Sequence, residues 1–290
     1  MISLTYEGFE LGLTPQLGGT VAYFRHEGRD LLRAATSAAP TDSAAFPMVP
    51  FCGRIANGRF PWNGREVRLA PNFPPEPHAI HGHGWTRPWE AAEIGPHRAL
   101  LRYEHTAGDW PWAYRAEQHF DLGPNGLTLG LSLTNLSEEP MPAGIGWHPY
   151  FAAAGASIEA NTSLVWETGP DMLPLPPRTP EGGEQLSGGA HVHDLKLDTP
   201  FSTGTRPITI RWPAQNLTLR MVPDDTLRFL VVYTPPGQDF FCAEPTSHIP
   251  NTVNLDGPAE MTGLLTLQHG ATLSGRIALS VNTGATGKPA

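Results

Sequence analysis

Cysteine is scarce in this sequence, since Cys52 and Cys242 are the only two among 290 residues. A chain of this length can bury a large core without a disulfide, and we expect both thiols to be free. No apolar run is long enough to cross a bilayer, and the first residues lack the basic start, apolar stretch and cleavage site of a signal peptide. We therefore expect a cytoplasmic protein.

Positive charge is also scarce. The 19 lysine and arginine residues are outnumbered by 28 aspartate and glutamate residues, which leaves a formal net charge of -9 at pH 7. A phosphate backbone or an anionic lipid surface would repel such a chain at long range. We expect no nucleic-acid partner and no membrane partner, and a small neutral molecule fits this charge better.

Helical patterns are few. The alanine-rich stretch 34–45 is interrupted by Pro40 and Thr41, and no long segment keeps a 3.6-residue hydrophobic period. The 31 glycines and 31 prolines instead divide the chain into many short segments. This composition favours strands joined by turns.

Alternation with period two is the strongest pattern. In GLTLGLSLTN (126–135), four leucines share one face and small or polar residues share the other. The pattern recurs in 217–222 and 272–281, whereas 227–234 is a continuous apolar run typical of a strand covered on both faces. The sequence predicts an all-β fold, a large antiparallel β-sandwich with few short helices.

The chain is interpreted as a single domain over residues 1–282, followed by a flexible tail over 283–290. The proline- and glycine-rich stretch 171–189 could be a linker between two domains. We interpret it as a long surface loop, because the strands after it are too few to close a second sandwich.

Four segments combine polar groups, aromatic residues and glycine where strands give way to turns. They are FCGRIANGRF (51–60), HAIHGHGW (78–85), WHPYF (147–151) and FCAEPTSHIPNTVN (241–254). His148 and Glu244 each precede a proline, which favours extended backbone and places both at strand ends facing a cleft. Taken alone, His148 is more often a hydrogen-bonded core ring and Glu244 an exposed carboxylate.

In combination, GRIANGRF, IHGHGW, GIGWHPYF and CAEPTSHIPNTVN resemble, in order and separation, the aldose 1-epimerase (galactose mutarotase) family. The likeness covers nearly the whole chain. It implies a supersandwich of the galactose mutarotase type, no cofactor and no metal. It also implies interconversion of the α and β anomers of a free aldohexose such as galactose or glucose.

The resemblance also implies roles for individual residues. His148 matches the general acid of the family, Glu244 its general base, and His81 a histidine that assists near the ring oxygen and C1. Arg54 matches an arginine that binds sugar hydroxyls, and Asp198, in LDTPF, matches a substrate-binding aspartate through a shorter motif.

Further contacts are expected from the chemistry of a sugar, whose apolar face packs on aromatic rings. Trp85 and Trp147 are the candidate platforms, and Gln238 and Tyr233 are candidates for hydroxyl contacts. The sequence departs from the family where Gly53 replaces a common asparagine. It departs again where HGG becomes HGH, which leaves the role of His83 open.

Mutarotation needs one acid and one base. A proton leaves the anomeric hydroxyl, another arrives at the ring oxygen, and the ring closes again on the other face. An ionised carboxylate can take the first proton, and a histidinium with a pKa near the working pH can donate the second. Whether His148 or His81 delivers it stays open in the sequence.

Three other functions are considered. A cupin-like metalloenzyme could use His81, His83, Glu90 and His148, but a cupin needs its carboxylate about four residues after the second histidine. A hexose 6-phosphate epimerase would need clustered cations, for which Arg59, Arg65 and Arg87 are candidates. A sugar-binding sandwich without catalysis would keep the fold alone. A monomer and a homodimer are both compatible with the sequence.

Overall fold

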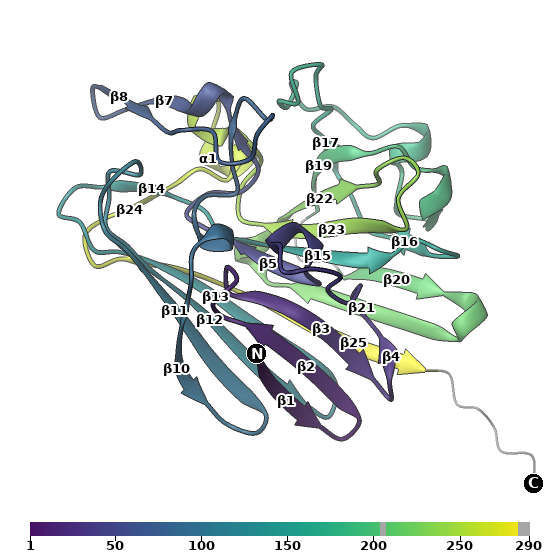
Figure 1. Ribbon diagram of the computed structural model, residues 1–290. Coiled ribbons are helices and arrows are strands. Elements are labelled where there is room, and N and C mark those ends of the chain that lie inside the picture. Colours follow the sequence, from purple (N-terminus) through teal and green to yellow (C-terminus); the bar gives the residue numbers. More distant parts are fainter. Residues whose placement is uncertain (204–206, 284–290) are drawn as a thin grey trace, which may run out of the picture.

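Two large antiparallel sheets form the computed structural model, which describes residues 1–203 and 207–283 (Figure 1). In the described residues, the first sheet has the order β1 (Ile2–Tyr6), β2 (Phe9–Thr14), β3 (Thr20–His26), β5 (Ala45–Met48), β15 (Gly146–Ala152), β23 (Phe240–Thr246), β22 (Phe229–Tyr233), β19 (Asp198–Ser202) and β17 (Leu164–Val165). A short strand, β4 (Arg29–Asp30), pairs with β3.

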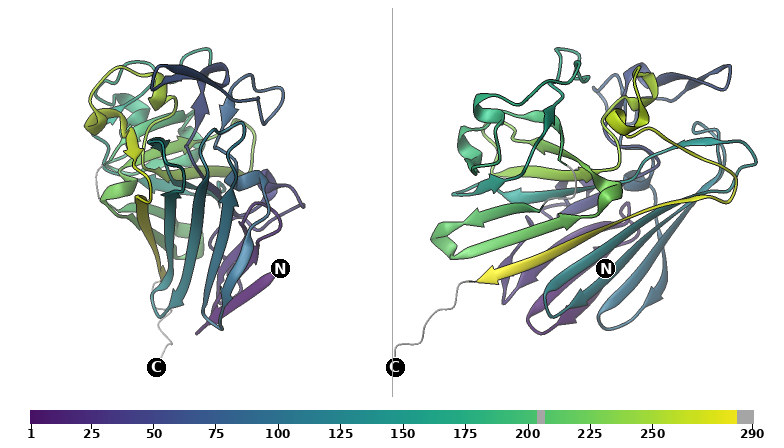
Figure 2. Two further views of the ribbon diagram at one scale, coloured as in Figure 1. Left: turned by 90° about the vertical axis from the view of Figure 1, so that its left-hand side faces the viewer. Right: turned by 180° about the vertical axis from the view of Figure 1, so that it is seen from behind.

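The second sheet has the order β10 (Glu90–Ile94), β11 (Arg98–His105), β12 (Tyr114–Gly123), β13 (Gly126–Asn135), β25 (Thr272–Thr283), β21 (Leu217–Pro223), β20 (Ile208–Trp212), β16 (Ser157–Glu159) and β18 (Ala190–His191). Seen from behind, the long strand β25 crosses the molecule next to β21 (Figure 2). Both sheets take strands from both halves of the sequence.

Smaller elements cover one end of the sandwich. Two-stranded ribbons join β6 (Arg54–Ile55) to β9 (Ala79–Ile80), β7 (Arg59–Trp62) to β8 (Arg65–Arg68), and β14 (Met141–Ala143) to β24 (Leu265–Leu267). The helices are α1 (Ala259–Thr262) and the 3-10 turns η1 (Pro40–Asp42), η2 (Ala56–Gly58), η3 (Gly84–Thr86), η4 (Gly182–Glu184), η5 (Val192–Asp194), η6 (Pro213–Gln215), η7 (Asp225–Leu227) and η8 (Thr252–Asn254). None of the described helices has the length and apolar character to span a membrane.

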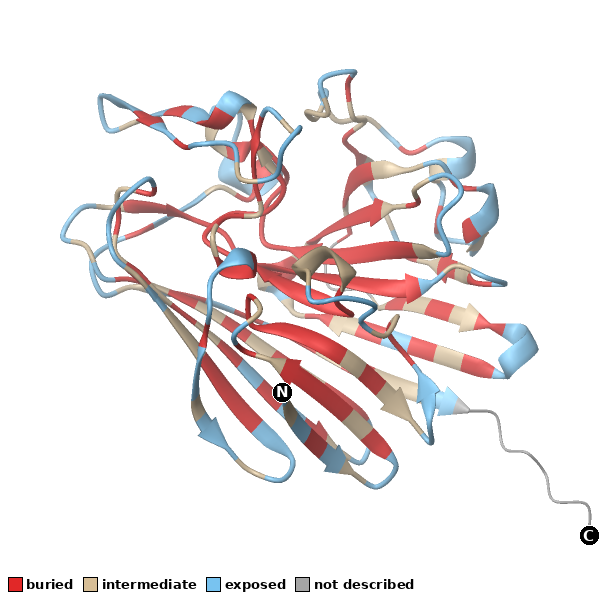
Figure 3. Ribbon diagram, in the orientation of Figure 1, coloured by how far each residue is buried: buried red, intermediate tan, exposed pale blue. Residues whose placement is uncertain are grey.

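The inner faces of both sheets share one hydrophobic core. Leu11 and Phe24 of the first sheet belong to the same buried cluster as Leu129 and Ile277 of the second, and all four are fully buried. Figure 3 shows the resulting alternation of buried and more exposed residues along β12 and β13. Each such side chain contributes roughly 1.5–3 kcal/mol of burial free energy, which fixes the strands that carry the site.

The all-β sandwich and its main strands are confirmed. The segments 126–135, 217–222 and 272–281 lie in β13, β21 and β25, and the apolar run 227–234 contains β22. Residues 171–189 connect β17 to β18 and contain only the turn η4. Of the expected tail, Thr283 still belongs to β25, and residues 284–290 lie outside the described residues.

Candidate active site

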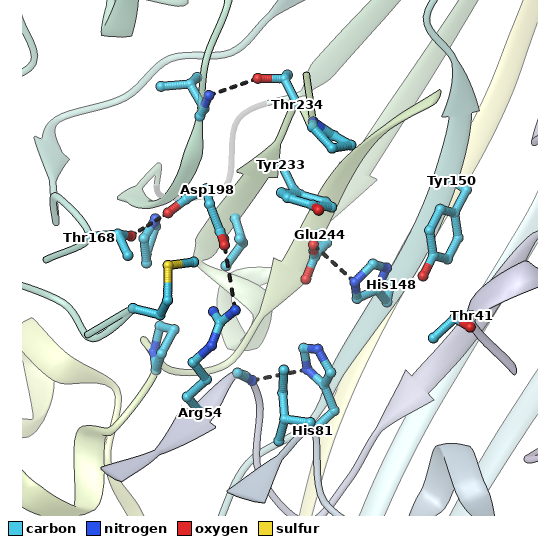
Figure 4. A pocket seen from close by; sticks show the side chains of 18 of the residues that line it. Thr41, Arg54, His81, His148, Tyr150, Thr168, Asp198, Tyr233, Thr234 and Glu244 are labelled. Atoms are coloured by element: carbon cyan, nitrogen blue, oxygen red, sulfur yellow. Dashed lines mark hydrogen bonds and ion pairs between the residues drawn. The ribbon is translucent and has the colours of Figure 1, made fainter. Parts of the chain in front are cut away.

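A cavity of about 590 Å³ opens over the middle of the first sheet. Its floor is formed by side chains of the adjacent strands β5, β15, β23 and β22, and its walls come from the loops around residues 41–54, 73–85, 168–174 and 196–198. Figure 4 shows these side chains converging from strands and loops far apart in the sequence. The volume falls within the range of small-molecule sites.

His148 and Glu244 meet on the floor of this cavity. Tyr150 pairs with Cys242 and Gly146 with Thr246 in the β15–β23 ladder, so the residues midway, His148 and Glu244, lie side by side. His148 Nε2 is 3.3 Å from Glu244 Oε1 (Figure 4). The expectation that an imidazole and a carboxylate from distant motifs face the same cleft is confirmed, but both residues lie inside strands rather than at the expected strand ends.

The imidazole of His148 is enclosed by other rings. Its centroid lies 4.3 Å from that of Phe46, 4.8 Å from that of Tyr150 and 5.3 Å from that of His81. Burial is the main cause that lowers the pKa of His148 to about 3, and the charge of Arg33 acts in the same direction. Burial therefore favours the neutral imidazole, which corrects the expectation of a pKa near the working pH.

Glu244 shifts in the complementary direction. Burial raises the pKa of this carboxyl well above its ordinary value, the nearby Asp198 carboxylate raises it further, and the Arg54 guanidinium lowers it. Burial thus favours the neutral form of both partners, with the proton of the pair on Glu244. Transfer of this proton from Glu244 Oε1 to His148 Nε2 would convert the pair into a carboxylate and an imidazolium.

Arg54 and Asp198, the two residues for which the family resemblance implies substrate binding, lie side by side on one wall. Arg54 Nε donates to Glu76 Oε2 at 3.0 Å, and its terminal nitrogen is 3.6 Å from Asp198 Oδ2. Burial raises the pKa of Asp198, with Arg54 opposing and Glu76 adding to the shift. The pair presents a guanidinium fork and a carboxylate to the cleft, a set that suits sugar hydroxyls.

His81 reaches the cleft from a strained turn after β9, with φ of 57°. Its Nδ1 accepts the backbone N–H of Gly53 at 3.2 Å, which in the neutral ring leaves the proton on Nε2. Burial, and then the charges of His148 and Arg54, lower the pKa of His81 well below its ordinary value. His81 is therefore suited to donate a neutral hydrogen bond.

The backbone conformation at position 53 explains why glycine stands where the family commonly has asparagine. Its φ is +64°, and a Cβ here would lie 2.6 Å from Pro250 Cγ. An asparagine would be strained at this position of the fold. The backbone of Gly53 instead positions the ring of His81.

The two expected aromatic platforms differ. Trp85 lines the cleft, and its indole N–H donates to the carbonyls of Ile80 and Gly82, which holds the turn that carries His81. Trp147 is fully buried in the core between the sheets, so its expected sugar contact is wrong. Neighbouring residues of a strand point to opposite faces, and Trp147 therefore cannot share the cleft with His148.

One further expectation fails on geometry, and the geometry also disfavours the cupin alternative. Gln238 lines a second cavity, of about 470 Å³, beyond the turn between β22 and β23, and is not among the residues that line the candidate site. His83 stacks on His105 with ring centroids 4.8 Å apart, and Glu90 is exposed on β10. Of the set that the cupin interpretation needs, His81 and His148 come together in the cleft, whereas His83 and Glu90 do not line it. Tyr233, by contrast, does line the cleft.

Arg33 and Tyr150 are cleft residues that the sequence reasoning missed. The guanidinium carbon of Arg33 lies 4.1 Å from the Tyr150 ring centroid, and its terminal nitrogen donates to the carbonyls of Thr41 and Ser43. Tyr150 could have been found, because it lies two residues after His148 on the same strand face. Arg33 follows a short edge strand and carries no local signal.

His248, in the last motif, supports the site from below. Its Nε2 accepts the backbone N–H of Cys52 at 3.1 Å, and its Nδ1–H donates to the carbonyl of Ile249 at 2.7 Å. The bond from Cys52 needs the neutral ring, because a protonated Nε2 cannot accept a hydrogen bond. Burial lowers the pKa of His248 to about 4, against the backbone bond to Ile249. This histidine fixes the segment that leads into Arg54.

Acidification is therefore expected to destabilise the protein partly through His248. The folded pKa lies below the unfolded value of about 6.5, so the unfolded chain binds the extra proton first, and stability falls as the pH drops below about 6.5. Between pH 7 and pH 5 this one group costs about 2 kcal/mol. Urea titrations at both pH values should show that His248→Gln removes about that much of the pH dependence. His191→Gln, at an exposed site, should leave the dependence unchanged.

Comparison with known proteins agrees with this geometry. The family model described as aldose 1-epimerase matches residues 3–280. The uncharacterized protein YphB of Escherichia coli (strain K12) is 32% identical over 264 residues, covering 86% of this chain and 88% of its own.

Solved structures share the fold. A crystal structure from Escherichia coli K12, of a protein provisionally named an aldose 1-epimerase, superimposes with a TM-score of 0.89 at 29% identity and covers 97% of this chain and 98% of its own. The structure of a galactose mutarotase-like protein from Clostridium acetobutylicum superimposes with a TM-score of 0.88 at 20% identity. The match covers 97% of this chain and 95% of the other. From the family match over nearly its whole length, and from the fold and cleft described above, the chain belongs to the aldose 1-epimerase family.

Proposed function

We propose that this protein interconverts the α and β anomers of a free aldohexose, such as galactose or glucose, by acid and base catalysis. One observation carries the proposal: His148 Nε2 and Glu244 Oε1 are 3.3 Å apart on the floor of a cleft of about 590 Å³. The two oxygens that exchange protons in this reaction are bonded to the same carbon. An adjacent acid and base can therefore serve both.

In the proposed reaction, Glu244 removes the proton of the anomeric hydroxyl while His148 protonates the ring oxygen. The bond between C1 and the ring oxygen breaks, C1 becomes an aldehyde, and rotation about C1–C2 exposes its other face. Ring closure returns both protons. The proton that burial places on Glu244 reaches His148 first, because the hydroxyls of a bound sugar and Arg54 stabilise the resulting charges. Each positioned group contributes roughly 10² to 10⁴ in rate.

His81, Arg54 and Asp198 are proposed to hold the sugar. His81 offers its Nε2–H to the ring oxygen region, and Arg54 and Asp198 bind hydroxyls on the opposite wall. Three cations of the described residues line the cleft, and all but the exposed Lys196 are engaged by protein groups, which favours a free rather than a phosphorylated sugar. Arg33 is engaged by carbonyls and aromatic rings and Arg54 by carboxylates, whereas Arg59, Arg65 and Arg87 do not line the cavity. We further propose a cytoplasmic location, with which the two free cysteines agree.

Polarimetry on freshly dissolved α-galactose and α-glucose tests the proposal. We expect the relaxation to accelerate in proportion to enzyme concentration. Glucose 6-phosphate and galactose 6-phosphate should respond less than the free sugars, and a larger response would favour the phosphorylated substrate. If the relaxation rate equals that of buffer for every sugar, the proposed catalysis is wrong and the alternative of a sugar-binding protein without catalysis is favoured.

Arg54→Lys is expected to weaken sugar binding. Lysine cannot present the planar fork that engages Glu76 and a hydroxyl at once. A hydrogen bond to a charged group contributes about 1.5–3 kcal/mol, which corresponds to a rise in KM of roughly 10- to 150-fold. Saturation kinetics by anomer-exchange NMR would measure it. Arg211→Lys, at a surface pair with Glu159, should leave KM unchanged.

A further inference from the structure

Cys242 lies directly beneath the catalytic pair. On β23 it shares a face with Glu244, two residues along, and it is paired with Tyr150 of β15 in the ladder that aligns His148. The side chain is fully buried, and no hydrogen bond to its thiol is found within residues 1–203 and 207–283. The proposed reaction makes no use of this thiol.

The three side chains form a compact set of different donors. One ligand atom each from His148, Cys242 and Glu244 lies within 4.8 Å of the others, and all three residues are buried. Imidazole nitrogen, thiolate sulfur and carboxylate oxygen are the donors that a borderline-soft divalent cation prefers. From this juxtaposition we propose that His148, Cys242 and Glu244 bind Zn²⁺ or a similar cation, which inhibits the enzyme by occupying its acid and base.

The spacing of the catalytic pair already fits such an ion. Zinc bonds to nitrogen and oxygen are about 2.0–2.2 Å long, so two such ligands of a tetrahedral ion lie about 3.3–3.6 Å apart. The observed distance between His148 Nε2 and Glu244 Oε1 is 3.3 Å. A zinc–sulfur bond of about 2.3 Å places sulfur about 3.5 Å from the other donors. Because the three ligand atoms lie within 4.8 Å of one another, a movement of Cys242 Sγ on the order of 1 Å would complete the set.

Charge also supports the assignment. A divalent cation with one thiolate, one carboxylate and one neutral imidazole forms a site with no net charge, which limits the cost of burial. The fourth tetrahedral position faces the cleft and can take water or a sugar oxygen. Binding expels the proton of the thiol and the proton shared by the pair, so affinity should rise with pH.

Cobalt provides the binding test, and this test does not depend on the proposed function. Co²⁺ titrated into sugar-free protein should give a near-ultraviolet thiolate-to-metal charge-transfer band, and Zn²⁺ should displace it. Cys242→Ala should abolish the band, and Cys242→Ser provides a second variant of nearly unchanged size. Cys52→Ala is the matched control, since Cys52 is buried in the same apolar cluster and is not part of the donor set.

Inhibition is measured separately and rests on the proposed function. Zn²⁺ should slow anomerisation of galactose in wild type and Cys52→Ala. The inhibition constant should rise at least about tenfold in Cys242→Ala and Cys242→Ser, because losing a direct ligand costs at least as much as losing an outer-shell partner. Each rate is normalised to the same variant without metal.

The outcomes separate the two proposals. A cobalt band without anomerisation of any sugar would support the metal site and contradict the enzymatic function. The metal site would be overturned if anomerisation occurs but no cobalt band forms. It would also be overturned if the cobalt band and the zinc inhibition constant are unchanged in both Cys242→Ala and Cys242→Ser. An equal loss of the cobalt band in Cys52→Ala would also overturn the metal site, because Cys52 is not one of the three proposed ligands.

Discussion

Replacement of Glu244 by glutamine should slow anomerisation by roughly 10²- to 10⁴-fold, the usual contribution of a positioned acid or base. Glutamine keeps the size and the hydrogen-bonding reach of the side chain but cannot take up a proton. The position next to His148 is retained, so the loss reports the chemistry of the carboxyl group. Polarimetric relaxation rates at saturating galactose measure this effect.

Stability should respond differently in the same variant. Burial raises the pKa of Glu244, which means that the fold opposes the charged carboxylate. A neutral amide removes that opposition, and we expect the urea midpoint to be equal to or above that of wild type. Glu90→Gln, on an exposed strand of the other sheet, is the control for rate and stability. A near-wild-type rate in Glu244→Gln would remove Glu244 from the mechanism.

His148→Asn should cause a second loss of roughly 10²- to 10⁴-fold, because the amide cannot deliver a proton to the ring oxygen. His81→Gln should lose only about 10- to 100-fold. Its amide can still donate a hydrogen bond, and a single neutral or charge-assisted bond accounts for about 1–3 kcal/mol. Both rates are measured by anomer-exchange NMR, with near-ultraviolet circular dichroism to check that the rings remain packed.

The comparison of the two histidines decides which of them delivers the proton. If His81→Gln loses more than His148→Asn, the donor is His81, and the contact between His148 and Glu244 would then position the base. His191→Asn, at an exposed residue of β18, controls for loss of an imidazole elsewhere. Its rate should match that of wild type.

Strand patterns in the sequence predicted much of this fold for a physical reason. The leucines of β13 alternate because one face meets the core and the other is more exposed, so period two is visible in the letters. β15 is covered on both faces, with Trp147 in the core and His148 in the cleft. Composition cannot say which face of such a strand is which, and the expected role of Trp147 failed at this point.

The sequence predicted those candidate-site residues that lie in recognisable motifs. Five predicted residues line one cleft. Four of them lie in compact motifs, namely Arg54, His81, His148 and Glu244, and the fifth, Asp198, lies in the shorter motif LDTPF. Arg33 depends on stacking over Tyr150 and on carbonyls of its own loop, which a linear pattern does not encode. Gln238 belongs to a turn whose direction only the folded loop determines.

The distance between His148 and Glu244 is fixed by the hydrogen-bonded ladder of two central strands, whereas the surrounding walls come from separate connections. Under the proposed function, the reaction would therefore depend on the strands and the choice of sugar on the loops. Libraries randomised at 72–76, 168–174 and 234–236 could retune which sugar is accepted while the reaction centre stays intact.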